Sequence, residues 1–158
     1  MENILNYWML TILPENFEAT RKNGYKLQGF GRSQRKKTER MEPGDRLIYY
    51  IKQKRAFPTS ATITSKMFKD ESPIWTSHRS DELFEYRVEI KTEVILNDDV
   101  WIDARDLVPR LDYVRKWPME LWEHAFYLEL HLLPRADFSL LESEMLRIVN
   151  KGGGKAAD

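Results

Sequence analysis

A cluster of basic residues behind two glycines is the part of this sequence best suited to bind an anion. The stretch from Leu27 to Arg40 reads LQGFGRSQRKKTER, and its first half contains Gly29, Phe30 and Gly31. Its basic residues follow directly: Arg32, Arg35, Lys36, Lys37 and Arg40. Glycine lets a ligand approach the backbone closely, and lysine and arginine neutralise phosphates. The stretch therefore predicts a phosphate contact, with a solvated helix face as the alternative interpretation.

One tryptophan stands in a segment with no strand or helix periodicity. Trp75 occurs in ESPIWTS, from Glu71 to Ser77, among a proline and small hydroxyl residues. Its large apolar ring needs a surface to cover, and its indole N–H needs a hydrogen-bond acceptor. Trp75 is therefore a candidate for one wall of a binding pocket, and the alternative is that it covers the hydrophobic core.

Residues suited to catalysis or metal binding do not form a recognisable set. The chain has no cysteine, which excludes thiol catalysis and zinc-thiolate sites. The three histidines, His78, His124 and His131, lack the spacing of metal ligands, and His131 falls on the polar face of a predicted strand. The turn at Asp98 and Asp99 lacks the glycine and the closing glutamate of a calcium loop. There is also no glycine-rich phosphate loop or nucleophile elbow, so the sequence predicts no enzyme, metal or cofactor.

Five segments have the composition and periodicity of strands. They are Tyr7 to Leu13, Arg46 to Lys52, Ala61 to Thr64, Tyr86 to Leu96 and Phe126 to Leu132. In the fourth segment apolar and charged residues alternate, with Arg87 and Glu89 on the charged face, so one side of this strand is expected to face solvent.

Two segments have the start and stop signals of helices. The first begins at Pro14, Glu15 and Asn16 and ends at Gly24, and the second carries Phe138 and later apolar residues at helical spacing. Strands outnumber helices and the two do not alternate strictly, which favours an α+β fold with a mixed sheet or small barrel. We expect a single domain over residues 1–150 and a disordered tail over residues 151–158.

The composition is that of an ordinary globular protein. Of the 158 residues, 42% are hydrophobic and 32% are charged, and the formal net charge is zero. Any affinity for anions must therefore come from local patches rather than from the overall charge. No apolar run reaches the roughly 20 residues that span a bilayer, and no secretory signal opens the chain, so we expect a cytoplasmic protein without a membrane partner.

Six segments in order carry a resemblance to a known family. They are NYWMLTILPENFEATRK, LQGFGRSQRKKTERMEPGDRLIYYI, ESPIWTS, YRVEIK, LVPRLDYVRKW and LLPRADFSLLESEM, and they span Asn6 to about Ile148. This order resembles the EVE domain family of small, UPF0310-like proteins. The resemblance implies a PUA-like fold, a mixed sheet or barrel with peripheral helices, related to the YTH domains that read N6-methyladenine in RNA. EVE domains are thought to read modified bases, notably modified cytosines in DNA, without catalysis.

The resemblance also implies roles for individual residues. Trp75 corresponds to a tryptophan that forms one wall of the base cage in YTH domains, and Asn16, after Glu15, corresponds to an asparagine that contacts the base. Where many relatives have a second cage tryptophan, this chain has Gln28 before Gly29, with Phe30 nearby. A glutamine can hydrogen-bond a base edge but stacks poorly, which leaves room for a polar modification.

The predicted partner is therefore a nucleic acid that carries a modified base, either modified cytosine in DNA or a modified base in RNA. Its phosphates are assigned to the basic residues of the first cluster, Arg32, Arg35, Lys36 and Lys37. Two simpler interpretations stay open: Asn16 is a helix cap, and the domain is a protein-interaction or homodimerisation module that binds no nucleic acid.

Overall fold

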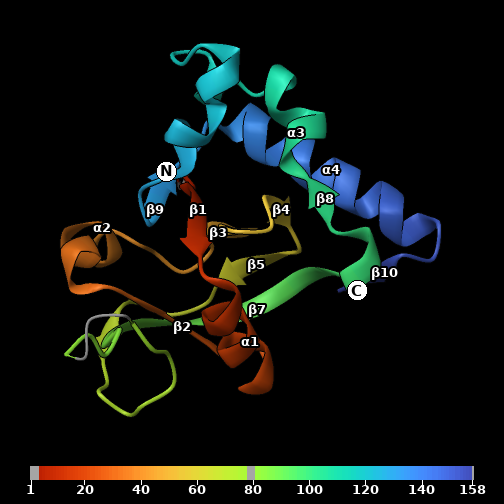
Figure 1. Ribbon diagram of the computed structural model, residues 1–158. Coiled ribbons are helices and arrows are strands. Elements are labelled where there is room, and N and C mark those ends of the chain that lie inside the picture. Colours follow the sequence, from red (N-terminus) through yellow and green to blue (C-terminus); the bar gives the residue numbers. More distant parts are fainter. Residues whose placement is uncertain (1–3, 78–80, 158) are drawn as a thin grey trace.

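A mixed sheet forms the centre of the molecule (Figure 1). The computed structural model describes residues 4–77 and 81–157. Its strands are β1 (Tyr7–Ile12), β2 (Leu27–Phe30), β3 (Arg46–Ile51), β4 (Ala56–Phe57), β5 (Thr59–Ile63), β6 (Phe68–Lys69), β7 (Tyr86–Leu96), β8 (Ile102–Asp103), β9 (Leu130–Leu132) and β10 (Gly154–Ala156). The main order is β10-β7-β5-β3-β1-β9, while β2 and β6 pair with β7, and β4 joins β3 to β8. Only β1 and β3 pair in parallel within the described residues.

Helices lie around this sheet rather than between its strands. The α-helices are α1 (Pro14–Lys22), α2 (Arg35–Glu39), α3 (Ala104–Leu107) and α4 (Arg135–Asn150). The short 3-10 helices are η1 (Arg32–Gln34), η2 (Asp98–Val100), η3 (Val108–Arg110), η4 (Asp112–Val114) and η5 (Met119–Phe126). In Figure 1, α3 and α4 lie together on one side of the sheet, and α1 and α2 lie near its other end. Within the described ranges no helix is both long and apolar enough to cross a membrane.

Strands β1 and β3 are buried on both faces, which explains their unbroken apolar sequence. In β1, Met9 packs into a core with α3 and α4, whereas Trp8 and Leu10 pack into a second core with α1. In β3, Ile48 and Leu47 divide between the two cores in the same way. The α+β class and the mixed sheet with peripheral helices are confirmed.

The structure corrects the expected strand from Phe126 to Leu132. Phe126 ends the helix η5, and regular pairing with β1 begins only at Leu130. A regular strand would place Leu128 on the same face as Phe126 and Leu130, but Leu128 is 65% exposed, and His131, predicted on the polar face, is buried with 2% exposure. The alternation of apolar residues fails here because a helix end and a bend, not a continuous strand, precede β9.

Two further expectations are corrected by long-range packing. Arg87 belongs to the predicted solvent face of β7, but it is fully buried because Ser72 and Phe84, from the irregular chain before β7, contact its guanidinium. The expected disordered tail contains β10, which pairs with the end of β7. A Cβ on Gly154 would lie 2.3 Å from the carbonyl oxygen of Ile95, so glycine permits this close pairing.

Candidate functional site

A cavity opens at the edge of the sheet where β1 and β3 both end. Parallel strands bring their carboxyl ends to the same edge, and here Lys52 N–H donates a 2.9 Å hydrogen bond to the carbonyl of Ile12. The cavity has a volume of about 430 Å³, within the range of small-ligand sites. It is lined by Leu10, Thr11, Ile12, Leu13, Asn16, Gln28, Gly29, Lys52, Gln53, Trp75, Ser77, Phe84, Tyr127 and Glu129.

Trp75 forms a fixed wall of this cavity. Its indole Nε1 donates a 2.9 Å hydrogen bond to Oγ1 of Thr20 in α1, and the Arg87 guanidinium lies 5.0 Å from its ring centroid. A Cβ on Gly29 would lie 2.6 Å from Cζ3 of Trp75, so only glycine lets the ring lie this close to β2. Trp75 is 4% exposed and lines the cavity, so its ring is not an open stacking platform, and it belongs to neither of the two core clusters.

Gln28 is buried in the same hydrogen-bond network. Its Oε1 accepts 2.8 Å hydrogen bonds from the hydroxyls of Thr20 and Tyr49, and its Nε2 donates to the carbonyl of Gly29 at 2.9 Å. An amide nitrogen carries two N–H groups, so one N–H of Gln28 has no acceptor among the described residues. The side chain therefore supports Trp75 through Thr20, and Gln28 is among the residues that line the cavity.

Asn16 holds the tryptophan segment to the start of α1. Its Oδ1 accepts a 2.9 Å hydrogen bond from Thr76 N–H, and its Nδ2 donates a 2.7 Å bond to Thr76 O. The Asn16 side chain does not cap α1, whose N-cap is Leu13. Asn16 thus positions the residue after Trp75, and one of its N–H groups has no acceptor among the described residues.

Phe30 does not reach the cavity. It is completely buried and packs in the core with Phe17 and Val88, and it is not among the residues that line the cavity. The structure thus brings Trp75, Asn16, Gln28 and Gly29 together and places Phe30 elsewhere. We therefore leave Phe30 out of the candidate site.

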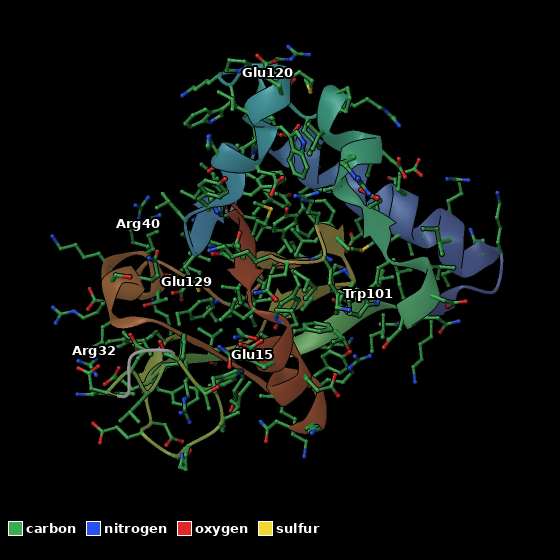
Figure 2. All side chains as sticks on the ribbon, in the orientation of Figure 1. Glu15, Arg32, Arg40, Trp101, Glu120 and Glu129 are labelled. Carbon is green, nitrogen blue, oxygen red and sulfur yellow. The ribbon has the colours of Figure 1, made fainter. Side chains whose placement is uncertain are left out.

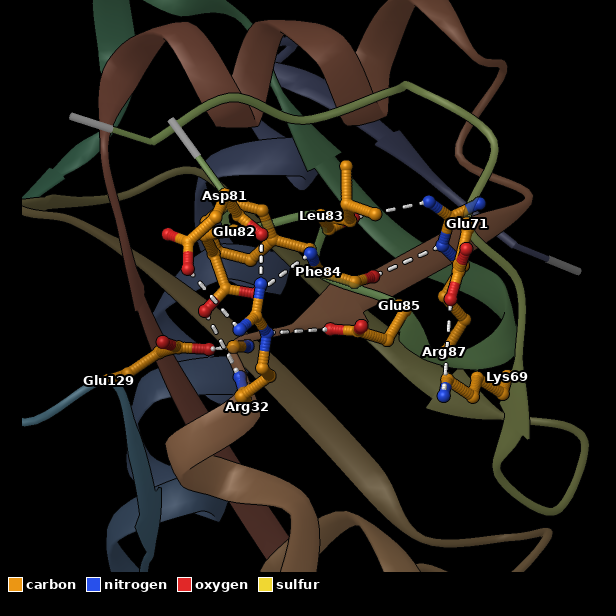
Figure 3. Close-up of polar contacts among 11 residues, drawn as sticks. Arg32, Lys69, Glu71, Asp81, Glu82, Leu83, Phe84, Glu85, Arg87 and Glu129 are labelled. Atoms are coloured by element: carbon orange, nitrogen blue, oxygen red, sulfur yellow. Dashed lines mark hydrogen bonds and ion pairs between the residues drawn. The ribbon is translucent and has the colours of Figure 1, made fainter. Parts of the chain in front are cut away.

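Three carboxylates surround Arg32, the first basic residue of the stretch from Leu27 to Arg40. Figure 3 shows Arg32 among Asp81, Glu82 and Glu85. The Arg32 guanidinium lies 3.5 Å from a carboxylate oxygen of Asp81 and 3.5 Å from one of Glu85, and the Arg32 N–H donates to Glu82 at 3.2 Å. Because its charge is balanced locally, Arg32 anchors the segment after residue 80 rather than presenting a free charge.

The other three predicted phosphate ligands differ in whether their charged groups already have partners in the protein. Arg35 pairs with Glu39 at 3.1 Å, one helical turn away, and Lys37 Nζ donates to the carbonyl of Leu130 at 2.7 Å. Lys36 is exposed and has no ion pair or side-chain hydrogen bond with any described residue. Of the four, Lys36 presents the least encumbered charge to solvent.

Sequence reasoning missed three cavity residues that come from distant segments. Tyr127 is 54% exposed at the rim, and Phe84 lines the wall with a left-handed backbone φ of 50°. Glu129 lies just before β9, on the side of α2 (Figure 2). The sequence shows the aromatic residues of the 126–132 segment. A regular strand there, however, would place Glu129 on the solvent face rather than in a cavity.

A buried histidine, His131, holds the segment that carries Tyr127 and Glu129. Nδ1 of His131 is 2.7 Å from the Tyr113 hydroxyl, and Nε2 is 2.6 Å from the carbonyl of Leu128. These contacts fit a neutral ring that accepts from tyrosine and donates to the carbonyl, and burial lowers the pKa of His131 to about 4. His131 is therefore structural. His78 lies outside the described residues, and the described residues contain no group of three or more side chains that could hold a metal ion.

The sequence pattern of a known family covers this whole arrangement. The profile of the EVE domain matches residues 6–143, which include every strand that borders the cavity. The chain belongs to the EVE domain family. Members of the UPF0310 group are similar to it along almost their full length: a protein of Pyrococcus horikoshii is 26% identical over 155 residues, covering 90% of this chain and 100% of that protein. A protein of Pyrococcus abyssi is 23% identical over 150 residues, covering 88% and 99%.

Solved structures show the same fold at low sequence identity. The Mmi1 YTH domain, solved in complex with RNA, superimposes with a TM-score of 0.67 and 12% identity, over 95% of this chain and 83% of that chain. A protein of unassigned function from Leishmania major gives a TM-score of 0.64 and 13% identity, over 91% and 96%. The EVE domain therefore shares its fold with YTH domains.

Proposed function

We propose that this EVE domain is a non-enzymatic nucleic-acid-binding module that takes up one modified base, from modified cytosine in DNA or from RNA. The observation that carries the proposal is the convergence of Trp75, Asn16, Gln28 and Gly29 on one cavity. Its volume suits a single base, its Trp75 wall is held rigidly, and it retains N–H donors for a base edge. The RNA complex of the Mmi1 YTH domain supports a nucleic-acid ligand for the shared fold.

The experiment that tests the proposal is a titration of the wild-type protein and Trp75→Leu with short oligonucleotides at fixed salt. The set contains cytosine, methylated, hydroxymethylated and carboxylated cytosine, and N6-methyladenine. We expect one modification to bind more tightly than its unmodified parent, and Trp75→Leu to remove about 1–3 kcal/mol of that binding. Trp101→Leu is the matched control, because Trp101 packs beside Phe17 and lies outside the cavity lining.

A second function is favoured by an exposed apolar patch around a second surface hollow. The patch contains Trp117, Leu128 and Leu132, which line this hollow and are each 38% to 65% exposed. Such patches often mark protein interfaces, which suits the interaction or homodimerisation alternative. In that case sedimentation would show self-association that Leu128→Ser abolishes, and oligonucleotide binding would be weak and independent of the modification.

A further inference from the structure

The Glu129 carboxylate lines the cavity and forms no ion pair with any described residue. Its Oε2 accepts a 2.7 Å hydrogen bond from Gly31 N–H, and its Oε1 has no hydrogen bond or ion pair with any residue in the ranges 4–77 and 81–157. The neighbouring cation, Lys37, directs its Nζ to the carbonyl of Leu130 at 2.7 Å instead. One carboxylate oxygen is thus held in place and the other remains an open acceptor.

The surroundings of Glu129 make this acceptor both rigid and unsatisfied. The Glu129 carbonyl accepts a 2.8 Å hydrogen bond from Thr11 N–H, which fixes its backbone beside β1. Burial raises the pKa of the Glu129 carboxyl, and Glu82 adds to this effect, whereas Gly31 N–H and Lys37 oppose it. A partly buried carboxylate oxygen without a hydrogen-bond donor opposes folding, so its position in a ligand-sized cavity indicates a use in binding.

We infer that Glu129 selects the class of base, by accepting a hydrogen bond from an amino group at C4 of a pyrimidine or C6 of a purine. The inference rests on the proposed function, because it assigns the chemistry of the same cavity. A carboxylate accepts well from the N4 amino group of cytosine. A carbonyl at the same position, as in thymine or hypoxanthine, would set two acceptors against each other with no proton between them.

The energetic consequence is discrimination between bases of nearly equal size and shape. A site that hydrogen-bonds an amino group rejects the carbonyl analogue strongly, since the buried polar group then loses its partner. The cavity should therefore take 5-methylcytosine in preference to thymine.

The test uses two pairs of single-stranded oligonucleotides that each differ at one base. The first pair carries 5-methylcytosine or thymine, and the second carries adenine or hypoxanthine. For the wild-type protein we expect the amino member of each pair to bind about tenfold or more tightly. In Glu129→Gln the preference should shrink to about twofold, because an amide can turn either its oxygen or its NH₂ group to the base.

Glu82→Gln is the matched control. It removes the same charge close to Glu129, but Glu82 does not line the cavity, so the amino preference should persist. Gly31→Ala is an independent second variant: its Cβ would lie 2.7 Å from Oε1 of Glu129 and would displace the carboxylate without removing it. We expect it to reduce the preference as well, which keeps the test intact if Glu129→Gln does not fold.

The outcomes separate this inference from the proposed function. Equal wild-type binding within both pairs, or a preference that survives in Glu129→Gln and in Gly31→Ala, would overturn the role of Glu129. If Trp75→Leu still weakened binding in that case, the base-binding proposal would stand. Absence of oligonucleotide binding, or binding that Trp75→Leu leaves unchanged, would overturn both.

Discussion

The indole Nε1 of Trp75 donates a 2.9 Å hydrogen bond to Oγ1 of Thr20, across 55 residues of sequence. The Thr20 hydroxyl lies 2.8 Å from Oε1 of Gln28, which also accepts from the Tyr49 hydroxyl. This relay links the tryptophan segment to α1, β2 and β3. A loop tryptophan thereby acquires the partner for its N–H and the surface for its ring that its local sequence does not supply.

Thr20→Val should break this relay without changing the volume of the side chain. The variant leaves Trp75 Nε1 without its acceptor and removes one donor to Gln28, so we expect a loss of about 1–3 kcal/mol in the free energy of unfolding. Urea denaturation measures this change. Thr92→Val is the control, since the Thr92 hydroxyl has no hydrogen bond within the described part of the chain. Equal effects of the two variants would contradict the relay.

Gly29→Ala should displace Trp75. The added Cβ would lie 2.5 Å from the carbonyl oxygen of Phe84 and 2.6 Å from Cζ3 of Trp75, and neither can move away easily. Overpacking of this kind costs roughly 1–3 kcal/mol, and binding of a modified oligonucleotide should fall with it. Thermal unfolding and titration measure the two effects. A variant as stable as wild type would show that the tryptophan wall is not fixed by this contact.

The basic stretch should contribute to binding through Lys36 rather than Arg32. Each phosphate neutralised on a single strand adds a slope of about −0.7 to the logarithm of affinity against the logarithm of salt concentration. Lys36→Ala should remove about one such contact from the slope measured by titration between low and moderate salt. Arg32→Ala should leave the slope unchanged, because Asp81 and Glu85 already balance its charge. A slope that falls in Arg32→Ala but not in Lys36→Ala would instead assign the phosphate contact to Arg32.

Acid should destabilise the fold through His131. Its pKa is about 4 in the folded protein and about 6.5 in the unfolded chain, so the unfolded state binds the proton first as the pH falls. The stability contributed by the neutral ring is full above pH 6.5 and is lost progressively between pH 6.5 and 4, by about 2–4 kcal/mol in total.

Denaturation of wild type and His131→Gln at several pH values measures this loss. The stability difference between the two proteins should shrink as the pH falls through that window. His124→Gln, which alters a histidine outside the buried contacts of His131, controls for the general effect of acid on the fold. A difference that stays constant with pH would contradict the assigned neutral state.

The sequence by itself determined those elements whose signals are local. Pro14 and Gly24 bracket α1, the apolar runs at Tyr7 and Arg46 became the doubly buried strands β1 and β3, and the helical spacing after Phe138 became α4. These signals come from residues within one or two helical turns of each other, or from an apolar run as long as a strand. Both kinds of signal can be read directly from the sequence. The family resemblance added the fold.

Tertiary structure alone decided how the cavity is built. Glu129 and Tyr127 reach it because η5 ends at Phe126 and the chain bends before β9, which changes the side that each residue faces. Arg87 is buried because a segment without regular structure folds over β7, and no periodicity describes such a contact. The environment of each of these side chains depends on which distant segments pair with its strand or cover it. In a regular strand with one open face, the same residue types would face solvent.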